Sequence, residues 1–377
     1  MPDFIYLDNG ATTPPDPEIL QGMCLQAQAQ FGNPTSTHSM GRAALASLDE
    51  SRARIAAVID ARSEEVIFTS GGTESVGLAI LGLSGRSPGR IAYSAVEHSC
   101  VGQAAQWLKL HRGWAVDKLP VDADGRLTAE HVQQHLKADC RLVCVMMANN
   151  EIGTINDIEV LSRMIRSIAP RAKIVVDAVQ AFAKMPISVA QLGVDALAVN
   201  GHKIHGPKGI GALWCRHALQ PVFRGGGQEF GQRGGTPSPA LAWSLAEAAR
   251  RQQIDNLRIR NLRDALFERL SIRLPTISVT GPSLDGPRLG NNLHICIPGL
   301  PTEPLLNALS AEGIYASGGS ACRSGQFSPV LQAIGCASED GAYLRLTVGR
   351  FTTEGDLESA SERIASIVTA LRPVYTP

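Results

Sequence analysis

The sequence lacks the features of a membrane protein, a nucleic-acid-binding protein or a zinc protein. Its 35 lysines and arginines balance 35 aspartates and glutamates, so no excess charge favours a polyanionic partner. No apolar run reaches the roughly 18 residues of a membrane span, and the first residues lack the basic start of a signal peptide. The eight cysteines include no C-x-x-C spacing, which argues against a metal site. We therefore expect a cytoplasmic protein that acts on small molecules, without nucleic-acid or membrane partners.

The length and the pattern of the chain predict two domains. At 377 residues the chain exceeds the size at which one hydrophobic core usually stops growing. Strand-like and helix-like segments alternate from residue 90 to 199, which predicts an α/β fold with a mostly parallel sheet. A long charged helical pattern follows over 239–274. We predict a large domain over 15–255 and a small α+β domain made of 1–14 and 256–377.

One lysine stands out, on a turn bounded by glycines. Lys203 follows an apolar run over 195–199 and precedes another over 209–215, so it lies between two predicted core strands. A lysine that is partly desolvated there has a lowered pKa and attacks a carbonyl as a free amine, which is Schiff-base chemistry. From this segment alone, a solvated loop lysine is an equally good interpretation.

Polar residues also gather where the predicted strands end. Asp177 closes the β-branched run 173–176, and a carboxylate at the carboxyl end of a strand is typical of sites in open α/β sheets. Pyridoxal phosphate enzymes need a lysine and a carboxylate paired with the pyridinium nitrogen, and Lys203 and Asp177 fit these roles. His98 follows another predicted strand, where it either stacks on a planar cofactor or is a structural histidine.

Three loops have compositions that suit functional roles. The turn 70–72 before Thr73 opens a predicted helix, whose free backbone N–H groups either bind a phosphate or are simply capped. The glycine-rich segment 224–237 is a functional loop or a linker. Cys322 lies among small residues over 316–326, where a core cysteine is not expected, so it is a reactive thiol or an incidental exposed one.

The residues that identify a family are spread over nearly the whole chain. They are found at 6–13, 32–34, 69–75, 97–98, 149–153, 176–180, 201–209, 225–236, 320–322 and 345–353. With these motifs the sequence resembles the cysteine desulfurases, pyridoxal 5'-phosphate enzymes of the class V aminotransferase family. The resemblance implies the aspartate aminotransferase-like fold (fold type I) and a homodimer.

The resemblance also implies a role for each matching residue. Lys203 would bond covalently to the cofactor, Asp177 would pair with its ring nitrogen, and His98 would stack on the ring and assist proton transfer. Cys322 would take the sulfur of L-cysteine as a persulfide, leaving L-alanine, before transfer to an acceptor protein that the resemblance does not identify. The remaining roles are contacts to the ring hydroxyl (Gln180), to the phosphate (Gly72, Thr73, Asn200, Gly201, His202 and, from the partner subunit, Thr236) and to the substrate carboxylate (Asn150 and Arg350).

Two positions depart from the family pattern, and two other functions stay open. Asn200 stands where the family usually has serine, and Arg323 follows the cysteine where small residues are usual. A selenocysteine lyase or another carbon–sulfur lyase would keep the cofactor and dispense with Cys322 or tune it to selenium. A degenerate homologue would act only in sulfur relay or protein interaction, but the intact Lys203 and Asp177 favour an enzyme.

Overall fold

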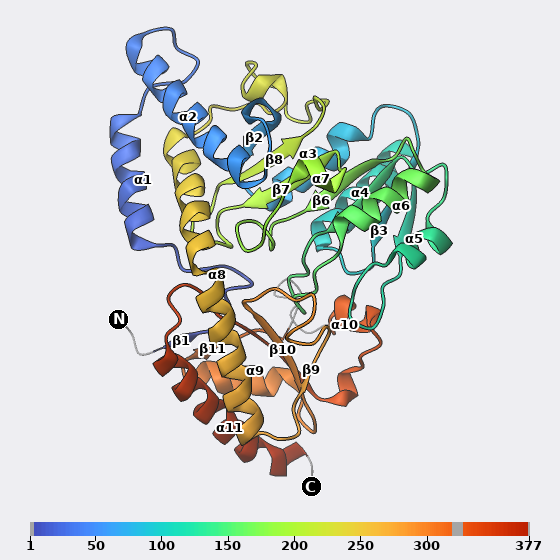
Figure 1. Cartoon of the computed structure of the whole chain (residues 1–377), viewed down its shortest axis with the longest axis vertical. Helices are drawn as coiled ribbons and strands as arrows, with labels where there is room; N and C mark the ends of the chain where they lie inside the picture. Colours follow the sequence, from blue (N-terminus) through green and yellow to red (C-terminus); the bar gives the residue numbers. More distant parts are fainter. Residues whose placement is uncertain (1–3, 319–326, 376–377) are drawn as a thin grey trace.

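A seven-stranded sheet forms the centre of the larger part of the molecule (Figure 1). The structure is a computed structural model and describes residues 4–318 and 327–375. Only β8 runs antiparallel to its neighbours, so the predicted mostly parallel sheet is confirmed. In spatial order the strands are β2 (Val66–Thr69), β8 (Gly211–Cys215), β7 (Ala196–Asn200), β6 (Lys173–Asp177), β5 (Leu142–Met146), β3 (Arg90–Ser94) and β4 (Ala115–Leu119).

Helices cover both faces of this sheet because side chains alternate along each strand. In β5, Val143 and Val145 belong to one buried apolar cluster, whereas Leu142 and Cys144 belong to another. The first cluster includes residues of α1 (Pro17–Ala29), α2 (Ser39–Val58), α5 (Ala129–His135), α6 (Ile158–Ile168), α7 (Val189–Leu192) and α8 (Pro239–Arg273). The second includes residues of α3 (Gly72–Leu83) and α4 (Ser99–Arg112).

Helix α8 is the long helix that the charged periodic pattern predicted, and it runs from the large sheet to the C-terminal part of the chain (Figure 1). Leu245 near its start packs in the sheet core, whereas Ile259 and Leu262 belong to a separate core. The predicted domain boundary at residue 255 falls within this helix, between the two sets of contacts. The exact extents of the domains stay a prediction.

The second core joins the N-terminal segment to the C-terminal third of the chain. Ile5 and Leu7 pack in it with residues from 259 onward. Its strands are β1 (Ile5–Tyr6), parallel to β11 (Ile314–Tyr315), and the antiparallel set β12 (Ala342–Thr347), β10 (Asn292–Ile297) and β9 (Ser278–Val279). Its helices are α9 (Thr302–Ala311), α10 (Pro329–Ala333) and α11 (Glu354–Tyr375). Short 3₁₀ turns lie at Ser63–Glu65, Glu229–Gly231 and Ser338–Asp340.

This topology brings the predicted polar residues to one edge of the sheet. Asp177 and Asn200 are the last residues of β6 and β7, and Asn150 follows β5. Because parallel strands end on the same side, their carboxyl ends form a common crevice. The site is built there.

Candidate active site

A pocket of about 780 Å³ lies at this edge and is lined by most of the residues singled out in the sequence. It also includes Glu97, Cys100, Glu151 and Arg345, to which the sequence analysis gave no role. The predicted residues in its lining are Gly72, Thr73, His98, Asn150, Asp177, Gln180, Asn200, His202 and Lys203. Gly201 lies in the chain between two of them and is buried.

Lys203 stands on the turn between β7 and β8, as predicted. Its Nζ donates to the carbonyl oxygen of Gly10 at 2.9 Å and to that of Ala11 at 2.5 Å. The N-terminal segment therefore lies against the lysine, although 192 residues separate Ala11 from it in the chain. Two bonds to carbonyl oxygens hold the amine at the pocket wall, where a carbonyl-bearing ligand would meet it.

Asp177 is buried beside this lysine, with 7% of its surface exposed. Burial raises the pKa of its carboxyl, while the backbone N–H of Val179, at 2.9 Å, and the charges of His98 and Lys203 act in the opposite direction. A buried carboxylate is costly unless a cation or donors pair with it. The pocket therefore suits a ligand that presents a protonated nitrogen to Asp177.

The start of α3 lies at the pocket, where the glycine turn predicted an anion site. Its N-cap, Gly71, makes no side-chain capping bond within the described residues, and φ is +155° there, in the region that favours glycine. Gly72 and Thr73 begin the helix and line the pocket. Free N–H groups and the helix dipole both attract an anion at such a terminus.

Asn200 closes the same anion site from the end of β7. Its Oδ1 accepts from the backbone N–H of His202 at 3.2 Å, which leaves its Nδ2 as the donor facing the glycine turn. A Cβ placed on Gly71 would lie 3.6 Å from this Nδ2. Asparagine thus supplies an amide donor where the resemblance expects a hydroxyl.

Burial lowers the pKa of two histidines that line the pocket, His98 and His202. Burial lowers the pKa of His98, which the charge of Asp177 opposes and that of Lys203 reinforces. Burial and the charge of Lys203 lower the pKa of His202 to about 4, and its Nδ1 lies 3.0 Å from Thr12 Oγ1. Both rings are consequently uncharged near neutral pH.

Gln180 connects the pocket wall to the N-terminal segment. Its Nε2 donates to the Gly10 carbonyl at 2.9 Å, and its Oε1 accepts from Lys184 Nζ at 3.4 Å. The Gly10 carbonyl thus receives bonds from both Gln180 and Lys203. The shared acceptor fixes the two side chains relative to each other.

Arg345, in strand β12, is the arginine of the pocket. It is 1% exposed, and its guanidinium donates to Asp8 Oδ1 at 2.7 Å and to the Asn150 carbonyl at 2.8 Å. Its Nε has no partner among the described residues. An arginine inside an otherwise apolar strand is a sequence signal for a site residue, because a buried cation is costly unless a carboxylate or other acceptors pair with it.

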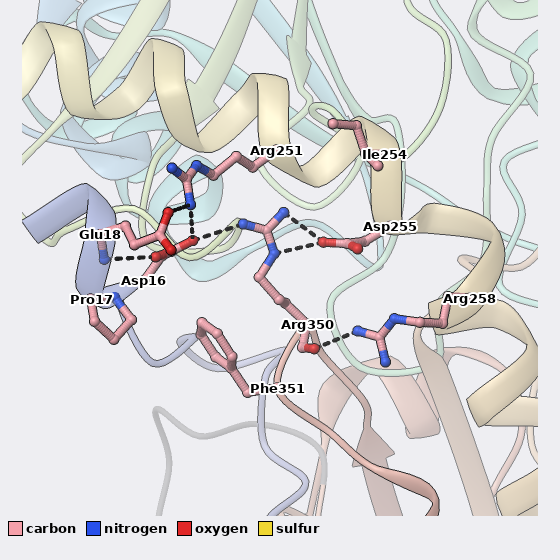
Figure 2. A pocket seen from close by; sticks show the side chains of 9 residues that line it. All are labelled: Asp16, Pro17, Glu18, Arg251, Ile254, Asp255, Arg258, Arg350 and Phe351. Carbon is pink, nitrogen blue, oxygen red and sulfur yellow. Dashed lines mark hydrogen bonds and ion pairs between the residues drawn. The ribbon is translucent and has the colours of Figure 1, made fainter. Parts of the chain in front are cut away.

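Arg350 does not line this pocket, contrary to the sequence-based expectation that it binds substrate. Figure 2 shows its guanidinium between Asp16, at 2.9 Å, and Asp255, at 2.6 Å, in a separate hollow beside α8. Its backbone N–H donates to His205 Nε2 at 3.1 Å. The two carboxylates bind the guanidinium from both sides, so Arg350 ties the segment after β12 to α8 and to the start of α1.

Thr236 and Cys322 are the two other residues predicted for the site. Thr236 is exposed on the loop before α8 and does not line the pocket of its own subunit. Cys322 lies outside the described residues. Within residues 4–318 and 327–375, no group of three or more histidine, cysteine or acidic side chains could hold a metal, and no helix could cross a membrane.

Comparison with known proteins shows the family to which the chain belongs. The family model described as Aminotransferase class-V matches residues 5–359. This protein belongs to that family. The cysteine desulfurase IscS of Dictyoglomus turgidum is 36% identical over 98% of this chain and 96% of its own.

Solved structures share the fold over nearly the whole chain. One titled "NIFS-LIKE PROTEIN" superimposes with a TM-score of 0.89 at 30% identity, covering 98% of this chain and all of its own. Another, titled "SspA in complex with cysteine", gives a TM-score of 0.81 at 29% identity over 93% of this chain and all of its own. The expected fold type is therefore confirmed.

The pocket of this class V aminotransferase fits pyridoxal phosphate. It offers an amine at Lys203, a buried carboxylate at Asp177 for a ring nitrogen, and an uncapped helix start at Gly72 for a phosphate. A Cβ on Gly72 would lie 2.6 Å from Val179 Cγ2, so only glycine leaves room there. The three groups match the three polar ends of the cofactor.

Proposed function

We propose that this protein is a cysteine desulfurase that binds pyridoxal 5'-phosphate and removes sulfur from L-cysteine. L-Alanine is released, and the sulfur is left as a persulfide on Cys322 for an acceptor protein. The bond from the substrate carbon to sulfur breaks, a sulfur–sulfur bond forms, and the carbon takes a proton. The observation that carries the proposal is the convergence of Lys203, Asp177, the α3 start and Arg345 on one pocket.

In this proposal each residue has a defined task. The bound cofactor would act as an electron sink for the substrate carbanion. Lys203 would hold it covalently and, once released by substrate, move a proton at the substrate Cα. Asp177 would keep the ring nitrogen protonated. His98 would lie on the ring face, and the phosphate would be bound by Gly72, Thr73, Asn200, Gly201 and His202.

We assign the substrate carboxylate to Arg345 with Asn150, in place of Arg350. A guanidinium has five N–H donors. Asp8 and the Asn150 carbonyl take one N–H each from Nη2 and Nη1 of Arg345 and so fix its orientation, whereas its Nε has no partner among the described residues and each Nη keeps a second N–H for a carboxylate. Such preorganisation reduces the entropy lost on binding. Asn150 lines the pocket next to it.

We further propose a homodimer in which Thr236 reaches the phosphate of the partner subunit. Thr236 is exposed, and large apolar side chains near it, Phe223 and Phe230, are 65% and 56% exposed. Exposed apolar residues that gather on one loop mark contact surfaces. Cytoplasmic location and the identity of the acceptor protein stay predictions.

The deciding experiment incubates the protein with L-cysteine and measures alanine and protein persulfide together. The wild type should form both in equal amounts during a single turnover and should show visible absorbance from the bound cofactor. Lys203→Ala should lose that absorbance and the activity. Cys322→Ala should keep the absorbance and lose both products. Retention of most activity by Cys322→Ala would replace the desulfurase with a carbon–sulfur or selenocysteine lyase, and a colourless wild type would remove the enzyme assignment.

A further inference from the structure

Cys100 is a pocket residue that the proposed mechanism does not use. It lies in the first turn of α4, two residues after His98, the N-cap of that helix, and it lines the pocket of the candidate active site. Its Sγ lies 3.0 Å from Nδ1 of the His98 ring. Its backbone N–H donates to the same Nδ1 at 3.3 Å. One ring nitrogen therefore faces two groups of a single residue.

The backbone contact decides which ring nitrogen of His98 carries the hydrogen. A backbone N–H is always a donor, so Nδ1 is the acceptor and has no hydrogen of its own. In a neutral imidazole the hydrogen is then on Nε2. The ring is fixed in the Nε2–H form by the start of α4.

The thiol acts in the same direction as the backbone. Burial raises the pKa of the Cys100 thiol well above its usual range, with the charges of Asp177 and Glu97 adding to the effect, so the thiol is protonated near neutral pH. Facing an acceptor at 3.0 Å, a protonated thiol donates its hydrogen. Protonation of Nδ1 would set its hydrogen against the backbone N–H and would force the thiol to turn its hydrogen away and act as a weak acceptor.

We propose that Cys100 is a positioning residue, whose thiol holds His98 as a neutral Nε2–H imidazole. The role rests on the proposed function, in which His98 lies against the cofactor ring. A neutral ring stacks there without adding a positive charge opposite the protonated pyridine nitrogen. The other charged groups that act on His98 are Asp177, from β6, which favours the imidazolium, and Lys203, which opposes it.

The test follows the His98 ring directly, by ¹⁵N NMR of the cofactor-loaded protein labelled at histidine. His98→Gln identifies the His98 signals by their disappearance. In the wild type, Nδ1 should be unprotonated and Nε2 protonated at neutral pH. In Cys100→Ala the midpoint of His98 protonation should rise by up to about one pH unit, the order expected for loss of one neutral hydrogen bond.

Matched variants separate the thiol hydrogen from the space that the thiol fills. Cys100→Ser restores a donor and should return the midpoint close to the wild-type value. Cys100→Val fills the space without a donor and should behave like Cys100→Ala, which covers the case of a poorly folded alanine variant. Cys140→Ala removes another thiol, one that donates to a backbone carbonyl outside the pocket, and should leave the midpoint unchanged.

The acidic limb of the pH profile for cysteine turnover should move with the NMR midpoint. An unchanged midpoint in both Cys100→Ala and Cys100→Val would overturn the proposal, as would a serine variant that shifts as far as alanine. A protein that shows the NMR shifts but forms no alanine from cysteine would refute the desulfurase function and leave the role of Cys100 intact.

Discussion

Replacing Arg345 tests which of two neighbouring arginines binds the substrate carboxylate. Arg345 is held in the pocket by Asp8 and the Asn150 carbonyl, whereas Arg350 is held outside it by Asp16 and Asp255. A hydrogen bond to a charged group contributes about 1.5–3 kcal/mol. Loss of the two bonds of a guanidinium–carboxylate fork therefore costs about 3 kcal/mol or more, which corresponds to a roughly 100-fold higher KM in Arg345→Ala.

The assay compares L-cysteine with cysteamine, which has the same thiol and amine but no carboxylate. The wild type should prefer cysteine by roughly 100-fold in kcat/KM, on the same energy. Arg345→Ala should lose this preference, and Arg345→Lys should keep part of it, since lysine keeps the charge but not the fork. Arg350→Met is the matched control and should keep the preference.

The result that would refute the assignment is the reverse pattern. If Arg345→Ala still discriminated fully against cysteamine while Arg350→Met did not, Arg350 would be the carboxylate residue. The two side chains would then have to exchange places on substrate binding. Circular dichroism of both variants establishes that each retains the fold.

Four further outcomes are expected. Arg350→Met should lower the free energy of unfolding by about 1–3 kcal/mol, because it removes the charged partner of Asp255, whereas Asp16 keeps its ion pair with Arg251. Urea denaturation measures this, and unchanged stability would contradict the role of Arg350 in tying the segment after β12 to α8. Asp177→Asn should lower kcat/KM by roughly 100-fold or more, because loss of the buried ion pair with the cofactor's ring nitrogen costs about 3–5 kcal/mol. Wild-type kinetics would remove Asp177 from the site. Hydrogen bonds from Arg250, then Arg251 and Arg54, outweigh desolvation and lower the pKa of Glu247 to about 2, so wild type should be more stable than Glu247→Gln at pH 7. This difference in unfolding free energy should disappear as the pH falls from about 4.3, the pKa of glutamate in the unfolded chain, through about 2, its pKa in the folded protein. A difference between wild type and Glu247→Gln that stays constant with pH would contradict the prediction. Sedimentation should give a dimer. A fully active monomer would contradict the proposal that Thr236 of one subunit binds the phosphate in the other.

Local patterns in the sequence were sufficient for the architecture and for half of the site. Strand ends, glycine turns and helix starts are encoded by residues close together in the chain, so the positions of Lys203, Asp177 and the start of α3 at the pocket could be predicted from the sequence. The same is true of the long helix α8, whose periodic pattern spans its whole length. These elements follow from backbone preferences and side-chain alternation, which act over a few residues.

The remaining half depended on contacts between distant segments. Arg345 and Arg350 are five positions apart and chemically identical, and only pairing with Asp8, 337 residues away, places the first in the pocket. The second is directed elsewhere by Asp16, 334 residues away. Gly10 and Ala11 likewise reach Lys203 through tertiary contacts of the N-terminal segment, which pairs with β11 through β1 and bonds to His202 through Thr13. The packing of the two cores determines which acidic residue pairs with each arginine. No local pattern in the sequence contains that information.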